Sequence, residues 1–345
     1  MKKLFLISLI ILVSGGILFS GVPSSAKDVI KLGFATKWPE RNPILQWTYM
    51  PALYEIESKS KGRIKFTLYP NAVLGKPHDH YDIARTGKVD IAEFSPGYMP
   101  GRFPLSNLIG LPMCYDHTGN SSRVVNKIVD KVLSKEFTDA HLLDLHRTEH
   151  FFLQGNVKVQ SLEDIKGLKI RSPSPIVGLA IKALGAEALN LSVTDLYLSL
   201  QTGVIDGTVS GSTIIPAFKI HEVTKYLLAF NFGCTSTGLV MNQNSWKKLP
   251  DDLKPIVAKA FAKNGFRHAM FAAAAIPDCW GLLKKRAGKG AVISLSPEEK
   301  KRWAKILSAM VDKWVNDLEA KGISARAALG FAREACKKKG VTFRW

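Results

Sequence analysis

The chain has 345 residues, of which 46% are hydrophobic and 22% are charged, and these values exclude a protein that is disordered as a whole. This length allows two domains. The net charge of +19 is typical of nucleic-acid-binding proteins, but a basic surface also attracts small anions and acidic membrane headgroups.

Residues 1–26 have the pattern of a secretory signal peptide. Lys2 and Lys3 precede an apolar run from Leu4 to Leu12, and small residues at 24–26 offer a cleavage site. A membrane anchor is the alternative, but serine and glycine interrupt the apolar stretch and no cysteine lies near the cleavage site. We therefore expect an exported, periplasmic protein that begins near Lys27 and has no other membrane span. Export makes nucleic acid a poor candidate partner.

The next segments alternate between strand and helix patterns. The expected elements are a strand at 29–35, a helix that begins at Asn42-Pro43, a strand at 64–68, a short helix that ends at Thr86, and a strand at 89–94. This alternation predicts an α/β domain with a largely parallel sheet.

The alternation continues beyond residue 150. The expected elements are a one-turn helix capped by Ser161, a strand at 168–170, a helix at 177–184, a strand at 187–191, a helix capped by Thr194 that reaches Thr202, and a strand at 205–209. We therefore expect a second α/β unit.

The C-terminal part is predicted to be mostly helical. Residues 251–286 are nearly all helix in pattern, and Pro277 is able to kink that helix. Ser296 and Glu299 form a capping box before a further helix. Its apolar stripe is expected to pack against a lobe rather than bind a ligand; the stripe is Trp303, Ile306, Met310, Trp314 and Leu318.

Complete catalytic and metal-binding motifs are absent from the sequence. There is no G-x-S-x-G motif and no glycine-rich phosphate loop. His221-Glu222 begins like a zinc-protease helix, but Lys225 stands where the second histidine belongs. Residues 78–80 (His-Asp-His) lie in a polar turn, and His146 and His150 lie in strand-like sequence, where their spacing does not converge. We expect neither an enzyme nor a bound metal or other cofactor.

The four cysteines leave the disulfide question open. An oxidising compartment permits bridges, and an even count allows three pairings. However, the spacings between the cysteines are long, there is no C-x-x-C motif, and a chain of this size does not need disulfide bonds to be stable. Free thiols are therefore an equal alternative for Cys114, Cys234, Cys279 and Cys336.

Arg171 ends the predicted strand at 168–170 and precedes Ser172-Pro173. A guanidinium in this place is either a solvated surface charge or a fixed receptor for an anion. In open α/β sheets, ligands bind beyond the carboxyl ends of the strands, and Pro173 denies the strand a further ladder donor. The position favours the anion receptor.

Five runs of sequence carry a family resemblance: GRI through YPNAVLG at 62–75, GKVDIA at 87–92, LEDIKGLKIR at 162–171, DLYLSLQTGVIDG at 195–207, and MN through WKKLP at 241–250. In this order they resemble the DctP-type solute-binding proteins of TRAP transporters, the extracytoplasmic receptors for organic acids. The resemblance covers nearly the whole chain after the signal peptide.

The resemblance implies a two-lobed periplasmic clamshell in which the chain crosses between lobes more than once and a long helix spans both. The expected division is residues 27–150 plus 236–276 for lobe I and 151–235 plus 277–345 for lobe II. The protein is then a monomeric receptor that delivers an organic acid to TRAP membrane subunits. A periplasmic ligand sensor shares every sequence feature, and an enzyme that uses the same cleft is the less favoured alternative.

The resemblance also implies ligand contacts. Arg171 corresponds to the family's arginine that pairs with the ligand carboxylate, and a guanidinium presents two parallel donors that match a carboxylate. Where sialic-acid members have a second arginine, this chain has Phe151. Their asparagine after Asp-Gly corresponds to Ser210, and a phenylalanine corresponds to Val193. These departures predict an aromatic or branched monocarboxylate rather than a sugar acid or a dicarboxylate.

Further candidate contacts come from loops and aromatic residues. Ser95 and Tyr98 lie in a loop after a strand end, where functional residues concentrate, and Arg102 in the same loop is a weaker candidate. Phe232 and Trp38 are expected to contact the body of the ligand. Gln154 and Thr235, together with Tyr98, are alternative hydrogen-bond donors to the ligand.

Overall fold

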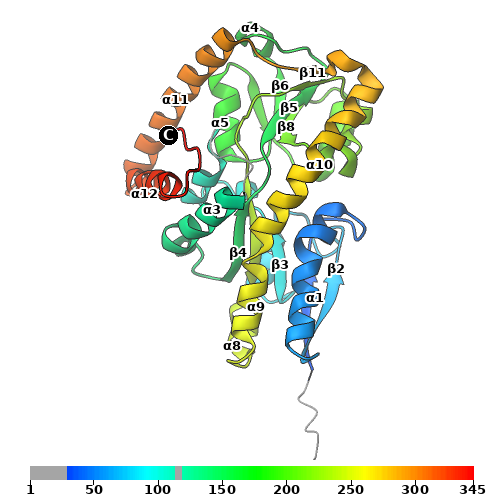
Figure 1. Cartoon of the computed structure of the whole chain (residues 1–345), viewed down its shortest axis with the longest axis vertical. Coiled ribbons are helices and arrows are strands. Elements are labelled where there is room, and N and C mark those ends of the chain that lie inside the picture. Colours follow the sequence, from blue (N-terminus) through cyan, green and yellow to red (C-terminus); the bar gives the residue numbers. More distant parts are fainter. Residues whose placement is uncertain (1–28, 113–118) are drawn as a thin grey trace, which may run out of the picture.

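The computed structural model describes residues 29–112 and 119–345. The chain builds two mixed β-sheets with helices around them (Figure 1). The first sheet has the strand order β2-β1-β3-β10-β4, and its strands are β1 (Ile30–Ala35), β2 (Ile64–Tyr69), β3 (Ile91–Phe94), β4 (His141–Arg147) and β10 (Ser236–Met241). The second has the order β11-β9-β5-β8-β6-β7, and its strands are β5 (Phe151–Gly155), β6 (Lys169–Ser172), β7 (Glu187–Asn190), β8 (Gly207–Gly211), β9 (Tyr226–Leu228) and β11 (Val292–Ile293).

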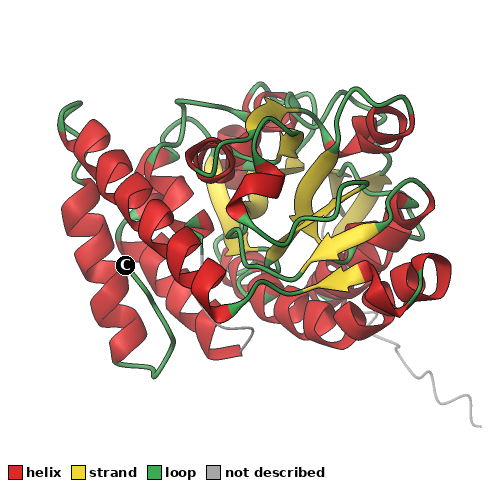
Figure 2. Cartoon of the chain, turned by 90° about the horizontal axis from the view of Figure 1, so that it is seen from above, coloured by secondary structure: helices red, strands yellow, loops and turns green. Residues whose placement is uncertain are grey.

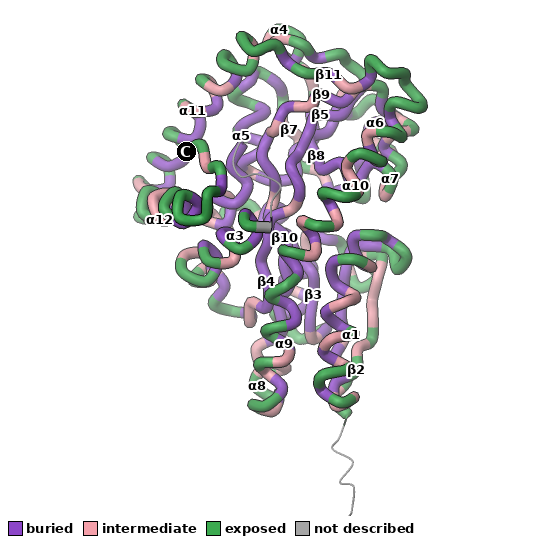
Figure 3. The backbone as a smooth tube through the Cα atoms, viewed as in Figure 1, coloured by how far each residue is buried: buried purple, intermediate pink, exposed green. Residues whose placement is uncertain are grey.

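Helices cover the outer faces of both sheets (Figure 2). The inner strands β3, β5, β8 and β10 form the buried centre of the molecule, whereas the edge strands β2 and β7 are partly exposed (Figure 3). The helices are α1 (Met50–Lys59), α2 (His80–Arg85), α3 (Gly119–Lys131), α4 (Leu162–Ile165), α5 (Pro175–Ala183), α6 (Leu196–Gln201), α7 (Ile214–Ala217), α8 (Gln243–Lys248), α9 (Lys254–Phe261), α10 (Asn264–Ala287), α11 (Pro297–Glu319) and α12 (Ala325–Lys337). A short π-helical segment, Leu45–Tyr49, precedes α1.

The sheets are mixed, which corrects the expectation of largely parallel ones. β10 is antiparallel to both β3 and β4, and β5 is antiparallel to β8 and β9. The reason is that two of the crossings between the sheets lead directly from strand to strand, from β4 to β5 and from β9 to β10. A strand that arrives from the other sheet starts at the edge where the neighbouring strands end, so it runs against them.

The two crossing segments are hydrogen-bonded to each other. Thr148 N donates to Thr235 O at 2.9 Å, and Phe151 N donates to Gly233 O at 2.8 Å. Gly233 has φ +105°, and a Cβ there would lie 2.2 Å from Gly110 O, so only glycine fits this part of the crossing. The long helix α10 forms a third connection and runs alongside both sheets (Figure 1).

Local sequence patterns account for most element boundaries. The Ser296 side chain accepts a hydrogen bond from Glu299 N at the start of α11, which is one half of the predicted capping box. The Glu299 carboxylate instead accepts from Leu162 N and Trp303 Nε1. Residues 251–286 are almost all helical, divided into α9 and α10, with Pro277 inside α10. The expected cap at Thr194 is wrong: Ser192 accepts from Thr194 N, and a 3₁₀ turn precedes α6.

The C-terminal helices act as packing elements. Four members of the apolar stripe on α11 are buried and Ile306 is half-buried. Trp303 contacts the rings of Phe230 and Phe232. α12 packs against α3, and Trp345 Nε1 donates to Pro112 O at 2.7 Å, so the chain end reaches back towards the first half of the sequence.

Several expectations fall at or beyond the edge of what the structure describes. The predicted signal peptide and Cys114 lie outside the described residues. Cys234 and Cys279 are buried free thiols, and Cys336 is also buried. Within residues 29–112 and 119–345, no helix combines the length and apolar character needed to cross a membrane.

Candidate functional site

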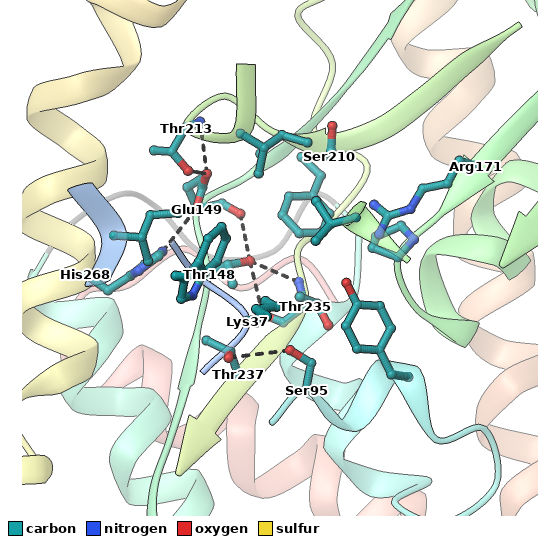
Figure 4. Close-up of a pocket in the computed structure, with 18 of the residues that line it drawn as sticks. Lys37, Ser95, Thr148, Glu149, Arg171, Ser210, Thr213, Thr235, Thr237 and His268 are labelled. Carbon is teal, nitrogen blue, oxygen red and sulfur yellow. Dashed lines mark hydrogen bonds and ion pairs between the residues drawn. The ribbon is translucent and has the colours of Figure 1, made fainter. Parts of the chain in front are cut away.

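A cavity lies between the two sheets, where their strand ends and the crossing segments meet (Figure 4). Its volume is about 70 Å³, which is room for several water-sized groups at about 10–15 Å³ each. Its lining residues are Lys37, Trp38, Ile44, Tyr49, Ser95, Tyr98, Thr148, Glu149, Phe151, Arg171, Pro173, Val193, Ser210, Gly211, Thr213, Ile214, Thr235, Thr237 and His268.

Arg171 is the buried cation of the second sheet. It is the third of the four residues of β6, rather than a residue beyond the strand end, and it is 2% exposed. Its Nε donates to Leu191 O at 2.8 Å, and no ion pair among the described residues includes it. Burial lowers the pKa of Arg171 from its ordinary value, although Tyr98 and Asp195 partly oppose that effect. A buried charge of this kind is costly without a counter-ion, so the site is suited to an anion.

The walls near Arg171 are mainly apolar. Phe151 and Val193 are 6% and 5% exposed and come from the second sheet and the turn after β7. Trp38 and Ile44 enter from the segment after β1, and the Trp38 ring also packs on Phe218 at 5.9 Å. A ligand that fills this cavity therefore contacts apolar surface on both sides.

Glu149 and His268 form a buried hydrogen-bonded pair where the first crossing meets α10. Their atoms Oε2 and Nε2 are 3.0 Å apart, and both side chains are 3% exposed. The other carboxylate oxygen accepts from Thr213 N at 3.2 Å and from the Thr213 hydroxyl. A Cβ at Gly211 would lie 2.1 Å from Glu149 Oε1, so glycine makes room for this carboxylate. The pair ties α10, the crossing and the end of β8 together (Figure 4).

A second buried pair joins Lys37 and Glu93 at the end of the first sheet. The Lys37 ammonium also lies 4.8 Å from the centre of the Trp38 ring. Thr237 Oγ1 donates to Glu93 Oε1 at 3.0 Å, and Ser95 Oγ lies 3.5 Å from Thr237 Oγ1. The first-sheet side of the cavity is therefore more polar than the wall around Phe151.

Comparison with known proteins shows which family has this architecture. The model of bacterial extracellular solute-binding proteins, family 7 (DctP), matches residues 34–317. The chain belongs to this family. Proteins of the family are solute-binding receptors rather than enzymes, and they are periplasmic.

Individual members of the solute-binding family resemble this chain to different degrees. The sialic acid-binding periplasmic protein SiaP of Vibrio cholerae is 30% identical over 219 residues, which are 62% of this chain and 68% of SiaP. A TRAP solute-binding protein from Rhodoferax ferrireducens, solved with copurified benzoate, is 25% identical with a TM-score of 0.82, covering 90% of this chain and 99% of that one. A marine metagenome TRAP protein in complex with 3-hydroxybenzoate has a TM-score of 0.83 at 24% identity, with the same coverage of both chains, and supports the fold alone.

The structure places most of the candidate ligand contacts of this solute-binding protein around one cavity. Seven line it: Arg171, Ser210, Phe151, Val193, Ser95, Tyr98 and Trp38. Phe232 does not, which corrects that prediction. It runs beside Phe151 through a backbone hydrogen bond of 3.0 Å, but its ring packs 5.9 Å from Trp303 in the core. Gln154 donates to Ser210 instead of lining the cavity, whereas Thr235 does line it.

The weaker candidates have other partners. Arg102 pairs with Asp82 and Asp139 away from the cavity. His78 packs against the Tyr98 ring at 4.7 Å, and His146 Nδ1 lies 2.7 Å from Asp144. In the part of the chain that the structure describes, no group of three or more His, Cys, Asp or Glu side chains is arranged to hold a metal ion.

The polar lining residues that the sequence analysis did not identify are Lys37, Tyr49, Thr148, Glu149, Thr213, Thr237 and His268. Lys37 offers the same sequence signal as Arg171, a charge at the end of an apolar strand. Glu149 and His268 offer none, because they are 119 residues apart and one of them lies on a long helix. Only the tertiary fold brings them together.

The stability of the protein is expected to fall steeply in acid because of Glu149. Burial alone would raise the pKa of Glu149, but the hydrogen bond and charge of His268, with Thr213, outweigh burial and lower that pKa from 4.5 to about 2. A carboxylate with a lowered pKa in the folded state stabilises fully above its unfolded pKa. That contribution should disappear as the pH falls from 4.5 to about 2.

The measurement is urea unfolding at several pH values for the native protein and Glu149→Gln. The variant lacks the titrating group, so its free energy of unfolding should depend less on pH within this window. Identical slopes for the two proteins would show that Glu149 is not the group responsible.

Proposed function

We propose that this protein is the periplasmic receptor of a TRAP-type secondary transporter, and that it binds an aromatic or branched monocarboxylate and delivers it to the membrane subunits. The observation that carries the proposal is the buried Arg171 guanidinium, which forms no ion pair among the described residues and lines the cavity between the sheets. A ligand carboxylate would supply the missing counter-ion in two-point geometry.

The choice of ligand class rests on the surroundings of Arg171. Phe151 lines the cavity where sialic-acid members would have a second arginine, and Val193 adds further apolar surface. A second carboxylate next to these side chains would lack a cation, and an uncompensated buried charge costs several kcal/mol. The benzoate bound by the Rhodoferax ferrireducens protein supports an aromatic acid.

Uptake would use closure of the two lobes and no covalent chemistry. The proposed lobes are residues 27–150 plus 236–276 and residues 151–235 plus 277–345, with α12 of the second packed on α3 of the first. A ligand held by Arg171 on one side and by the Trp38 side on the other binds the closed form better than the open one. This difference in affinity is what shifts the equilibrium to the closed form.

A periplasmic ligand sensor would use the same cavity, so it remains the second candidate. Genes for TRAP membrane subunits beside the gene of this protein would favour the transporter receptor. A catalytic role in the same cleft is disfavoured because the family consists of receptors.

Aromatic monocarboxylates should bind more tightly than succinate, malate or sialic acid, and Phe151→Arg should narrow that gap by adding the missing cation. Thermal-shift screening finds the binders, since a ligand at 100 times its Kd stabilises the protein by about 2.7 kcal/mol. Calorimetry then ranks them in the native protein and in the variant.

The matched control is Phe151→Leu, which removes the ring without adding charge and should keep the preference for monocarboxylates. Tight binding of a C4-dicarboxylate by the native protein, with no binding of aromatic acids, would contradict the proposed ligand class. The assignment to the receptor family would stand in that case.

A further inference from the structure

The two side chains of the Lys37–Glu93 pair, on the first-sheet side of the cavity, differ in how many of their hydrogen-bonding sites are already used. Lys37 lies two residues after β1, and Glu93 lies on β3. Their side chains are 7% and 0% exposed, and the Lys37 ammonium donates to Glu93 Oε1. Lys37 lines the cavity that Arg171 enters from the second sheet.

Glu93 has little capacity left to accept a hydrogen bond from a ligand. A carboxylate offers about four lone-pair sites. Oε1 accepts from the Lys37 ammonium and from Thr237 Oγ1 at 3.0 Å, a hydroxyl that also lies 3.0 Å from Phe94 O. Oε2 accepts from Thr36 Oγ1 at 3.0 Å and from Lys37 N at 3.4 Å. The carboxylate is therefore occupied by donors of the protein itself.

Lys37, in contrast, has N–H groups that are not used in hydrogen bonds to the protein. An ammonium group carries three N–H donors, and among the described residues its only hydrogen-bond acceptor is Glu93. One face of the ammonium is covered by the Trp38 ring at 4.8 Å. At least one N–H group is left for an acceptor in the cavity. Because Glu93 balances the charge of Lys37, this donor suits a neutral oxygen better than a second carboxylate.

We propose that Lys37 is a specificity-determining residue that donates a hydrogen bond to a neutral oxygen atom on the ligand. The ligand class is then an aromatic monocarboxylate that carries a hydroxyl, ether or carbonyl oxygen on its body, with its carboxylate on Arg171. This inference rests on the proposed function. In the closed form the ligand would then make a polar contact with each lobe, because Arg171 belongs to the second sheet and Lys37 follows a strand of the first.

Matched ligand pairs test the proposal without altering the protein. 3-Methoxybenzoate and 4-methoxybenzoate have nearly the same shape as 3-ethylbenzoate and 4-ethylbenzoate, but only the methoxy acids offer an acceptor. In a purely apolar pocket the ethyl acids bind better, because no desolvated oxygen is left unpaired. With Lys37 as donor, at least one methoxy acid should bind about tenfold more tightly than its ethyl twin. Isothermal titration calorimetry measures all four.

The double variant Lys37→Met/Glu93→Gln then assigns the preference to Lys37. Removing both charges avoids leaving Glu93 buried as an unpaired carboxylate. In this variant the ratio of the Kd values of the ethyl acid and the methoxy acid should fall to about one or below, because the donor to the methoxy oxygen is gone. The control Lys31→Met changes an exposed lysine on β1, the strand that precedes Lys37, and should keep that preference.

The outcomes separate the inference from the proposed function. If the native protein binds both members of each pair but does not favour the methoxy acid, Lys37 does not select for oxygen and only the inference fails. A preference that survives in the double variant overturns the role of Lys37 in the same way. If no aromatic monocarboxylate binds, the proposed ligand class fails and the inference fails with it.

Discussion

Replacing Arg171 with lysine should weaken ligand binding by about 1.5–3 kcal/mol, which is about 10- to 150-fold in Kd. Lysine keeps the charge but loses the planar pair of donors that matches a carboxylate. It also loses the 2.8 Å hydrogen bond from Arg171 Nε to Leu191 O, which holds the guanidinium in its orientation. Calorimetry with the tightest acid found for the native protein measures the loss.

The control for this prediction is Arg63→Lys, because Arg63 pairs with Asp252 away from the cavity and its replacement should leave affinity unchanged. A second variant, Arg171→Met, separates binding from structure. Replacing a buried charge that lacks a counter-ion by an apolar side chain should leave the unliganded protein as stable as before or more stable, while binding is lost. Native affinity in Arg171→Lys, with an unchanged circular dichroism spectrum, would show that another group holds the carboxylate.

Replacing Glu149 with alanine should lower the free energy of unfolding by about 3 kcal/mol. The change leaves His268 and the donors of Thr213 without their buried acceptor. The expected loss is at the lower end of the range for a broken buried pair. Urea unfolding at neutral pH measures the difference.

Glu163→Ala is the matched control for Glu149→Ala. Glu163 also forms an ion pair, with Arg302 at 2.9 Å, but its side chain is 57% exposed. Exposed pairs contribute about 0–1 kcal/mol, so this variant should be nearly as stable as the native protein. A double-mutant cycle with His268→Gln should give a coupling of about 1–3 kcal/mol. Additive effects would mean that the Glu149–His268 contact contributes nothing of its own.

Sequence patterns were most informative where they reflect local geometry. The Ser296 cap and the proline after it place the start of α11 correctly, because both act within one helical turn. The strand at 64–68 is found as β2, since alternation of apolar residues is a property of the strand itself. The cap at Thr194 failed for a local reason too: Ser192, two residues earlier, competes for the same role.

Some residues of the candidate site could also be proposed from local sequence, whereas others depend on the tertiary fold. Arg171, Phe151, Ser210 and Val193 could be proposed from the sequence because they stand at fixed positions within motifs that resemble those of the family. Phe232 could not be placed, because the direction of its ring depends on Phe230 and Trp303 in the core. No local pattern carries that information.

By itself, the sequence determined the family and the alternation of strands and helices, and it singled out Arg171 as the candidate anion receptor. These follow from short-range periodicity, caps and contiguous motifs. Only the tertiary structure decided the mixed order of the sheets and the polar partners in the cavity. Lys37 and Glu93 are 56 residues apart, and Glu149 and His268 are 119 apart. Such pairs form because two strand crossings and α10 bring distant segments together. Each buried charge loses its hydration, and only the partner that the fold brings next to it offsets that desolvation free energy.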